Sequence, residues 1–210
     1  MVTHATPRRR SPLRTRGMLV VLAVAFVQAA AYGIMEVAIP AHAEHLGHAS
    51  AAGILVALWS VGSIVGGLWY SGLTPRTPPY RQYGILMLLN VAGFAVILLS
   101  TGLVSLGALL LFAGLFIAPL TAVEFLLVTS LAADGTQTEA FTWANTAVYL
   151  GFAVGSALAG TALGPVLGTD SGLRVPGAVA VGLVALGAVL AIALRGRLRA
   201  DVTPVRATVD

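Results

Sequence analysis

Six long runs of apolar residues decide what this chain can fold into. They cover residues 18–40, 51–74, 83–100, 104–131, 138–164 and 173–194. A helix needs about 20 predominantly apolar residues to cross about 30 Å of hydrocarbon. The connections between the runs are short and contain polar residues, glycine or proline, which end helices. The sequence therefore predicts a bundle of six transmembrane helices.

Composition excludes the soluble classes of protein. Hydrophobic residues make up 58% of the chain and charged residues 10%, whereas a soluble domain has about 25% charged residues. Disorder is excluded as well, because it requires low hydrophobicity and high charge. The runs are apolar on all sides, without the alternation of membrane β-strands. The expected fold class is an all-α, polytopic membrane protein embedded in a lipid bilayer.

The arginines predict the orientation. Under the positive-inside rule, basic residues collect in cytoplasmic connections. If both termini lie in the cytoplasm, Arg174 is the only arginine on the outer side of the membrane. We therefore expect residues 1–17 and 197–210 to form cytoplasmic tails around a membrane bundle of residues 18–196. The basic excess flanks the spans, so no nucleic-acid partner is expected. The other eleven arginines are Arg8, Arg9, Arg10, Arg14, Arg16, Arg76, Arg81, Arg195, Arg197, Arg199 and Arg206.

Glu36 is a carboxylate inside the first span. A charged side chain at the bilayer centre costs about 2.5–3.5 kcal/mol on insertion scales, so it faces the bundle interior and marks a functional site by default. Glu36, Tyr32 and Gln28 follow one another at four-residue steps, which places them on one side of a helix. This polar stripe predicts the lining of a cavity. The alternative is a carboxylate near the interface that bonds to a neighbour.

Glu124 is the second intramembrane carboxylate, five residues after Pro119 in the fourth span. A proline inside a helix frees the carbonyl four residues earlier, here that of Leu115, and kinks the helix. Interrupted helices often border the cavities of transporters. The alternative is a structural kink whose carboxylate reaches the cytoplasmic interface. Glu36 and Glu124 lie about 9–11 Å from their span centres, on opposite sides of the midplane, as equivalent positions of inverted three-helix repeats would.

The fifth span carries a polar stripe at helical spacing, which includes Asn145 and Tyr149. These two side chains are predicted to contact a substrate. The alternative is that they bond to neighbouring helices, as we expect of the isolated Asn90 in the third span.

Two pairs of glycines predict close helix packing. Gly62 and Gly66 in the second span, and Gly151 and Gly155 in the fifth, have the spacing that lets two helix backbones approach. Such seams occur both in transporters and in static bundles.

The sequence offers little for catalysis or metal binding. Three histidines, His42, His45 and His48, flank Glu44 in the first outer connection. No rigid scaffold holds them, and we expect no metal site. The chain has no cysteine, which excludes thiol chemistry, and it lacks the phosphate-binding and metalloprotease motifs. We expect neither an enzyme nor a bound cofactor.

Several segments resemble the C-terminal six-helix half of a major facilitator superfamily transporter, in particular bacterial drug and sugar exporters. The resemblance covers residues 17–197. One departure follows Gly66, where the family has Asp-Arg and this chain has Tyr70 and Ser71. The segments that carry the likeness are residues 36–41, 57–63, 66–70 and 138–145, with Gly151, Gly155 and Gly160.

The resemblance implies two inverted three-helix repeats in a bacterial plasma membrane. It implies proton-coupled export of a small molecule such as a drug-like amphiphile or a sugar. Glu36, and after it Glu124, would take up and release the proton, while Gln28, Tyr32, Asn145 and Tyr149 would line the substrate site.

A complete family member has about twelve spans with its cavity between the halves, so six spans supply one wall. The partner would be an N-terminal half or a second copy. Two alternatives remain. One is a truncated or split half, or an assembly subunit, without transport activity alone. The other is a small carrier working as an antiparallel dimer, which the uneven arginine distribution disfavours.

Overall fold

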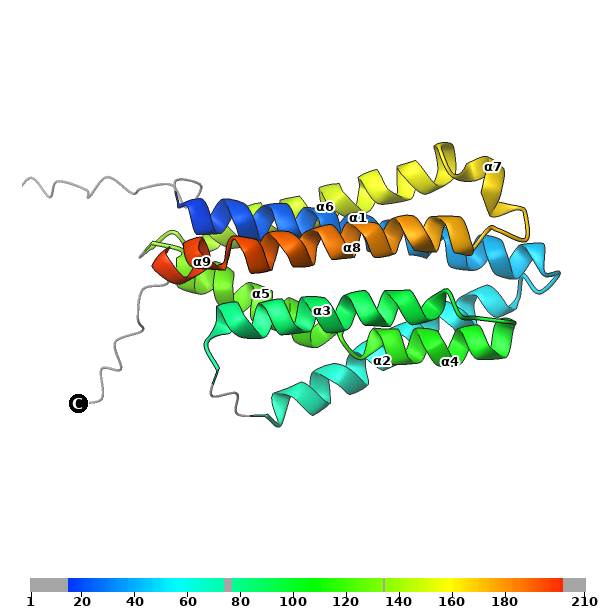
Figure 1. Cartoon of the computed structure of the whole chain (residues 1–210), viewed down its shortest axis with the longest axis horizontal. Coiled ribbons are helices and arrows are strands. Elements are labelled where there is room, and N and C mark those ends of the chain that lie inside the picture. The colour runs from blue at the N-terminus through cyan, green and yellow to red at the C-terminus, as the bar shows by residue number, and fades with distance from the viewer. Residues whose placement is uncertain (1–14, 74–76, 134, 202–210) are drawn as a thin grey trace, which may run out of the picture.

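The chain folds into an elongated bundle of helices that run side by side along its long axis (Figure 1). The computed structural model describes residues 15–73, 77–133 and 135–201. The expected terminal tails lie largely outside these residues. Within them the elements are α1 (Arg16–His45), α2 (Ala51–Ser71), α3 (Pro79–Ile97), α4 (Leu103–Gly114), α5 (Ile117–Leu131), α6 (Gln137–Thr161), α7 (Gly164–Leu167), α8 (Arg174–Ala193) and α9 (Arg195–Asp201).

Five of the six predicted runs each correspond to one long helix, and the fourth corresponds to the α4–α5 pair. Within the described ranges, five of these segments are long and apolar enough to cross a membrane: α1, α2, α3, the α4–α5 pair and α8. The exception is α6, which has 25 residues but carries the polar stripe. Helix α1 runs on through Pro40 to His45, past the predicted end of the first span. Helix α3 begins at Pro79, earlier than predicted, because proline is well suited to the first turn of a helix.

The fourth predicted span is broken where Pro119 requires it. Helix α4 ends at Gly114 and α5 begins at Ile117. Proline has no N–H to donate to the carbonyl of Leu115. That oxygen instead lies against the backbone of Gly66 on α2, where a Cβ on Gly66 would come within 1.9 Å of it. The absence of a side chain at Gly66 is what allows α2 to approach the break.

Glycines also let α6 approach α1. A Cβ on Gly155 would lie 2.0 Å from the Ala30 oxygen, and one on Gly151 would lie 2.2 Å from the Phe26 oxygen. In return, a Cβ on Gly33 of α1 would lie 2.2 Å from the Phe152 oxygen of α6. All three distances are below any real contact of a Cβ atom, so this seam joins backbone to backbone.

The α2–α4 seam repeats this arrangement. On α2, Gly62 faces the carbonyl of Leu111 in α4, and Gly66 faces that of Leu115, the residue after α4. In return, Gly114 of α4 faces the carbonyl of Trp59 in α2. In each seam, two glycines four residues apart on one helix therefore pack beside a single glycine on the other helix. The repetition matches two three-helix units, α1–α2–α3 and α4/α5–α6–α8.

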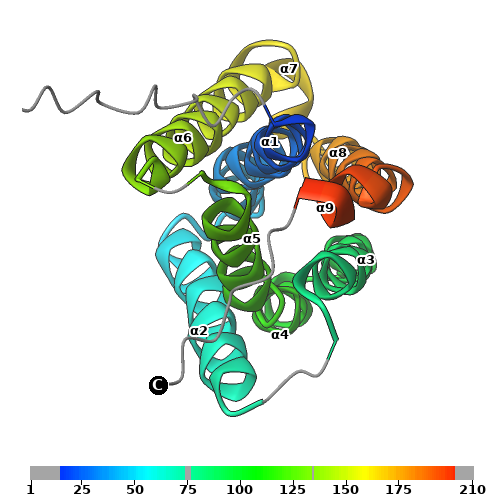
Figure 2. The same cartoon turned by 90° about the vertical axis from the view of Figure 1, so that its left-hand side faces the viewer.

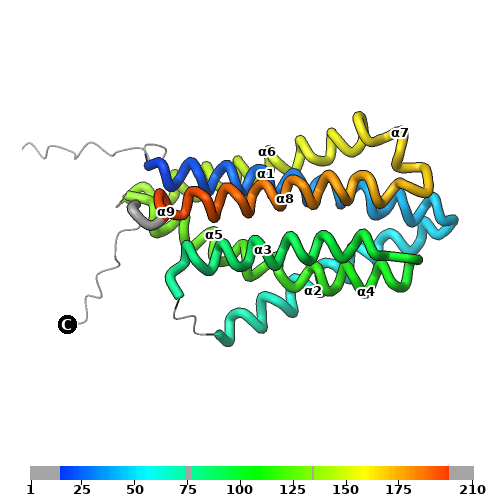
Figure 3. Tube along the Cα trace, viewed as in Figure 1, coloured from blue at the N-terminus to red at the C-terminus, as the bar shows by residue number. Residues whose placement is uncertain are grey.

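The helices form two sides of unequal character. Viewed from one end (Figure 2), α1 and α5 lie between α6 and α2 on one side and α8 and α3 on the other. The tube in Figure 3 shows α8 alongside α1 over most of its length. The exposed residues of α8 beyond Arg174 are all apolar, as are those of α3 beyond Arg81. The α3–α8 side thus suits contact with lipid chains.

The apolar core consists of two clusters. One includes Val21, Met87 and Leu127, towards the end where α1 begins. The other includes Ile34 and Phe94, towards the opposite end. Of the buried polar residues described below, Gln28 and Asn90 lie at the level between the clusters, whereas Tyr83 belongs to the first cluster.

Candidate functional site

A buried polar layer joins α1 to α3. The side-chain amide of Gln28 donates to the Tyr32 hydroxyl at 2.9 Å, and the amide of Asn90 on α3 donates to the same oxygen at 2.7 Å. Gln28 is 4% exposed and Asn90 is fully buried. The Asn90 bond cross-links the two helices at mid-bundle, where no lipid group could replace it, whereas the Gln28 bond lies within α1.

Two hydrogen-bond acceptors in this layer have no donor. No described protein group donates to Gln28 Oε1 or to Asn90 Oδ1. A buried polar atom without a partner costs about 1–3 kcal/mol. Rotating either amide would offer its oxygen to the Tyr32 hydroxyl proton, at the cost of releasing its own N–H bond. The three side chains can therefore exchange partners, and can accept a donor from outside.

Aromatic rings hold Tyr32 in place. Its ring meets Trp59 of α2 edge-on with centroids 5.9 Å apart, and lies 5.4 Å from the ring of Phe94 on α3. Trp59 and Phe94 also contact each other edge-on at 6.0 Å. Such pairs contribute about 0.5–1.5 kcal/mol beyond their burial. Tyr32 thus connects three helices.

Glu124 forms a second part of the buried layer. It is 4% exposed, and the hydroxyl of the fully buried Tyr83 on α3 donates to its Oε2 at 2.9 Å. Tyr32 lies within electrostatic range of this carboxyl group. Among the described residues no arginine or histidine pairs with it. The carboxyl group therefore points into the bundle rather than towards the interface.

Glu36 has a different environment from the rest of its predicted stripe. Gln28 and Tyr32 turn into the bundle, whereas Glu36 is exposed and makes no hydrogen bond or ion pair within the described ranges. On the helix it falls between Gly33, which faces α6, and Tyr32, which faces α3. Because Pro40 lies four residues ahead, the Glu36 carbonyl also lacks its helical donor. A carboxylate and a freed carbonyl thus share one exposed position.

The two glutamates are also not equivalent under the repeat. The seams pair Gly33 with Gly114, and the same offset relates Glu36 to Ile117 rather than to Glu124. Glu36 and Glu124 therefore do not occupy equivalent positions of the two repeats, although the sequence places them on opposite sides of the membrane midplane.

Asn145 and Tyr149 lie on the exposed side of α6, and Tyr149 is 73% exposed. The α1–α6 seam places Phe26 level with Gly151 and Ala30 level with Gly155, so the two helices are parallel. Tyr149 is then level with Val24, about 18 Å from Glu36 along the axis at the rise of an α-helix. The predicted site residues are therefore spread along the length of the bundle.

The family model of the Major Facilitator Superfamily matches residues 18–209. The chain belongs to the major facilitator superfamily. No curated protein and no solved structure matches it. Members of the superfamily are membrane transporters rather than enzymes, so this chain is a membrane-embedded protein of the transporter type.

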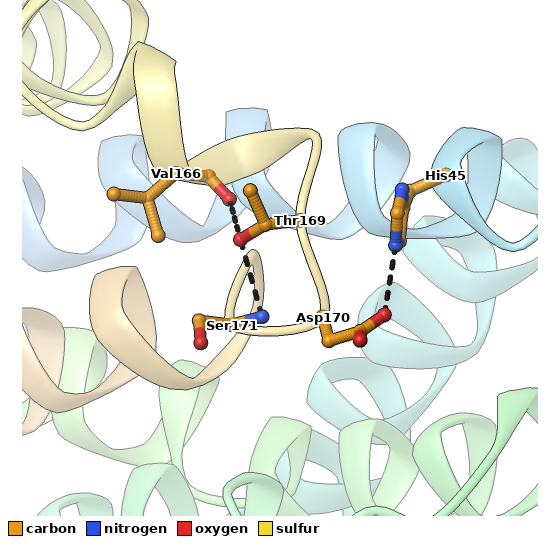
Figure 4. Close-up of polar contacts among 5 residues, drawn as sticks. All are labelled: His45, Val166, Thr169, Asp170 and Ser171. Carbon is orange, nitrogen blue, oxygen red and sulfur yellow. Dashed lines mark hydrogen bonds and ion pairs between the residues drawn. The ribbon is translucent and has the colours of Figure 1, made fainter.

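A polar contact joins a helix end to a connection at the end of the bundle opposite the start of α1. His45 Nε2 lies 3.2 Å from Asp170 Oδ1, and Thr169 bonds within its own turn to Val166 and Ser171 (Figure 4). No group of three metal-ligating side chains forms in the part of the chain that the structure describes. His45 therefore joins the end of α1 to the segment before α8.

Sequence reasoning missed Tyr83, which is the donor to Glu124 in this superfamily member's buried layer. Asn90 is expected from the sequence to bond to a neighbouring helix, and its bond to Tyr32 of α1 confirms this. The seven-residue spacing of Tyr83 and Asn90 on α3 is a signal that places both on one side of the helix. Neither partner could be named without knowing that α3 lies beside α1 and α5.

Proposed function

We propose that this chain forms one wall of a proton-coupled secondary transporter that exports a small molecule such as a drug-like amphiphile or a sugar. It corresponds to the C-terminal half of the fold, in a bacterial plasma membrane with both termini cytoplasmic. The arginines of α1, α3 and α9 lie at the opposite end of the bundle from Arg174, which supports this orientation. The observation that carries the proposal is the burial of Glu124 against Tyr83.

Proton coupling follows from the surroundings of Glu124. An ionised carboxylate without a cation partner is costly in the membrane interior. The neutral acid is therefore the form that suits the conformation described here. A conformational change that admits water to the α3–α5 junction would allow the proton to leave. Tyr83 then has a positioning role, because its hydroxyl bonds to Glu124 in either protonation state.

The exposed position of Glu36 supports the presence of a second set of helices that covers this side of the bundle. A carboxylate at membrane depth cannot face lipid chains without the insertion cost given above. The side between α6 and α2 carries Glu36, Asn145 and Tyr149, whereas the α3–α8 side is apolar. We infer that an N-terminal half or a second copy covers the α2–α6 side and encloses a polar cavity. Glu36 would serve this cavity as a second proton or substrate site.

The substrate site would combine this surface with the buried layer. Asn145 and Tyr149 present side-chain donors and acceptors towards the cavity. Behind them, Gln28 and Asn90 hold carbonyl oxygens that the protein leaves unpaired. Such acceptors suit a substrate with hydroxyl or ammonium donors. Tyr32 connects the two regions through its half-buried ring.

Transport by reconstituted protein tests the proposal. Proteoliposomes with an imposed pH gradient and an enclosed pH-sensitive dye would receive ethidium or lactose as probes. Glu124→Gln should abolish probe-dependent proton movement, and Glu36→Gln should reduce it. Glu44→Gln is the matched control, because Glu44 is exposed at the end of α1. Proton movement that survives in Glu124→Gln would remove this residue from the mechanism.

The second candidate is a half-transporter or assembly subunit without activity of its own, which the exposure of Glu36 and Tyr149 favours. The chain contains no cysteine, so Tyr149→Cys introduces a single one on that side. Disulfide-linked dimers in membranes would support a working homodimer. Monomers that are inactive alone but active with a co-expressed six-helix partner would support a split transporter.

A further inference from the structure

A groove between α3 and α8 has features that the transport proposal does not use. It opens at the end of the bundle where α3 begins and α9 follows α8, with a cavity volume of about 360 Å³. A smaller hollow continues it past Gly196. Its polar end is formed by Tyr80, Arg81 and Arg195, and its walls include Ile85, Leu88 and Ile192.

The two arginines bring positive charge together from different helices. Arg81 lies in the first turn of α3 and Arg195 begins α9. Both are exposed, and neither pairs with a carboxylate among the residues that the structure describes. Two unpaired guanidinium groups beside one hollow favour an anion, and their planar donors suit phosphate oxygens. The phenol of Tyr80 adds a hydroxyl donor beside them.

The groove changes from charged to apolar along the helix. Arg81, Ile85 and Leu88 follow at spacings of four and three residues, so they share one side of α3. Leu88 lies about 10 Å deeper than Arg81 at the rise of an α-helix. Ile85 and Leu88 are each 54% exposed, on the side of the bundle that suits lipid. The order of charge and apolar surface matches a phospholipid, with its headgroup at the interface and its chains in the hydrocarbon.

We propose that the α3–α8 groove binds an anionic phospholipid of the adjacent leaflet. The phosphate sits between Arg81 and Arg195, and one acyl chain lies along Ile85, Leu88 and Ile192. Basic pockets between transmembrane helices bind acidic lipid headgroups. The bound lipid bridges α3 to the α8–α9 junction.

Native mass spectrometry of the full chain released from detergent tests this site. The probes are phosphatidylglycerol, phosphatidylcholine with the same acyl chains, and glycerol 3-phosphate as the free headgroup anion. Wild-type protein should retain one phosphatidylglycerol more tightly than phosphatidylcholine, and should not retain glycerol 3-phosphate. Equal retention of the two lipids would overturn the proposal, and retention of glycerol 3-phosphate would reassign the groove to a soluble anion.

Paired variants separate this groove from general surface charge. Arg81→Gln with Arg195→Gln should weaken the tightest phosphatidylglycerol by about 25-fold, or about fivefold for each arginine, which corresponds to about 1 kcal/mol each. Arg16→Gln with Arg197→Gln removes the same charge from a separate hollow between α1 and α8 and should leave this lipid in place. An equal loss in both double variants would overturn the assignment.

A third variant tests the acyl-chain wall without changing charge. A Cβ on Gly84 would lie 3.4 Å from Ile192 Cγ1, so Gly84→Leu fills the groove. It should release the lipid while both arginines remain. Circular dichroism verifies that each variant is folded, and if the arginine variant unfolds, Gly84→Leu decides. Full lipid retention in a folded Gly84→Leu variant would contradict the proposal.

Discussion

Replacing Gly155 by alanine should loosen the α1–α6 seam. The new Cβ would lie 2.0 Å from the Ala30 oxygen, so the helices must separate by roughly 1 Å. Overpacking of this kind costs about 1–3 kcal/mol, and a gap of that size forfeits about a quarter to a half of the dispersion energy of the surrounding contacts. We therefore expect Gly155→Ala to destabilise the bundle by about 1–3 kcal/mol.

Gly160 provides the matched control on the same helix. A Cβ there would meet nothing within 4 Å, and alanine is favoured over glycine in a helix by about 1 kcal/mol. Gly160→Ala should thus be neutral or stabilising. Reversible unfolding in mixed micelles, followed by circular dichroism, measures both variants. If Gly155→Ala were as stable as wild type, or Gly160→Ala equally damaging, the seam would not be the backbone contact described here.

Two further substitutions test the buried layer. Asn90→Ala removes a donor to Tyr32 and should lower the free energy of unfolding by about 0.6 kcal/mol, the average for a hydrogen bond between membrane helices. The same unfolding assay measures this loss. A loss as large as that of Gly155→Ala would indicate a packing role instead. Tyr83→Phe removes only the hydroxyl that bonds to Glu124 and should slow probe-dependent proton movement while leaving the amount of folded protein unchanged; a normal rate in proteoliposomes would show that Tyr83 does not position the carboxyl group.

Features that depend on local chemistry could be predicted from the sequence. The apolar runs predicted the long helices, and Pro119 predicted the break between α4 and α5, because a missing N–H acts wherever the helix lies. The glycine spacings indicated backbone approach in the same way. None of these inferences required knowing which helices are neighbours.

Features that depend on helix rotation and on neighbours could not be predicted. Gln28, Tyr32 and Glu36 share a stripe at four-residue steps, but each step advances the position by about 40° around the helix. Over two steps this turns Glu36 out of the bundle while Gln28 stays inside. The partners Tyr83 and Asn90 became visible only once α3 was placed against α1 and α5. A polar stripe alone does not say which member is buried.

Difference infrared spectroscopy on Glu124 tests the central proposal most directly. A protonated carboxyl group has a carbonyl stretch that an ionised one lacks, and the burial of Glu124 predicts that this band is present in the substrate-free protein. The band should be missing in Glu124→Gln, remain in Glu36→Gln, and change when substrate opens the junction. Identical spectra of the wild-type and Glu124→Gln proteins would contradict the account, because the buried carboxyl group would then carry no proton to exchange.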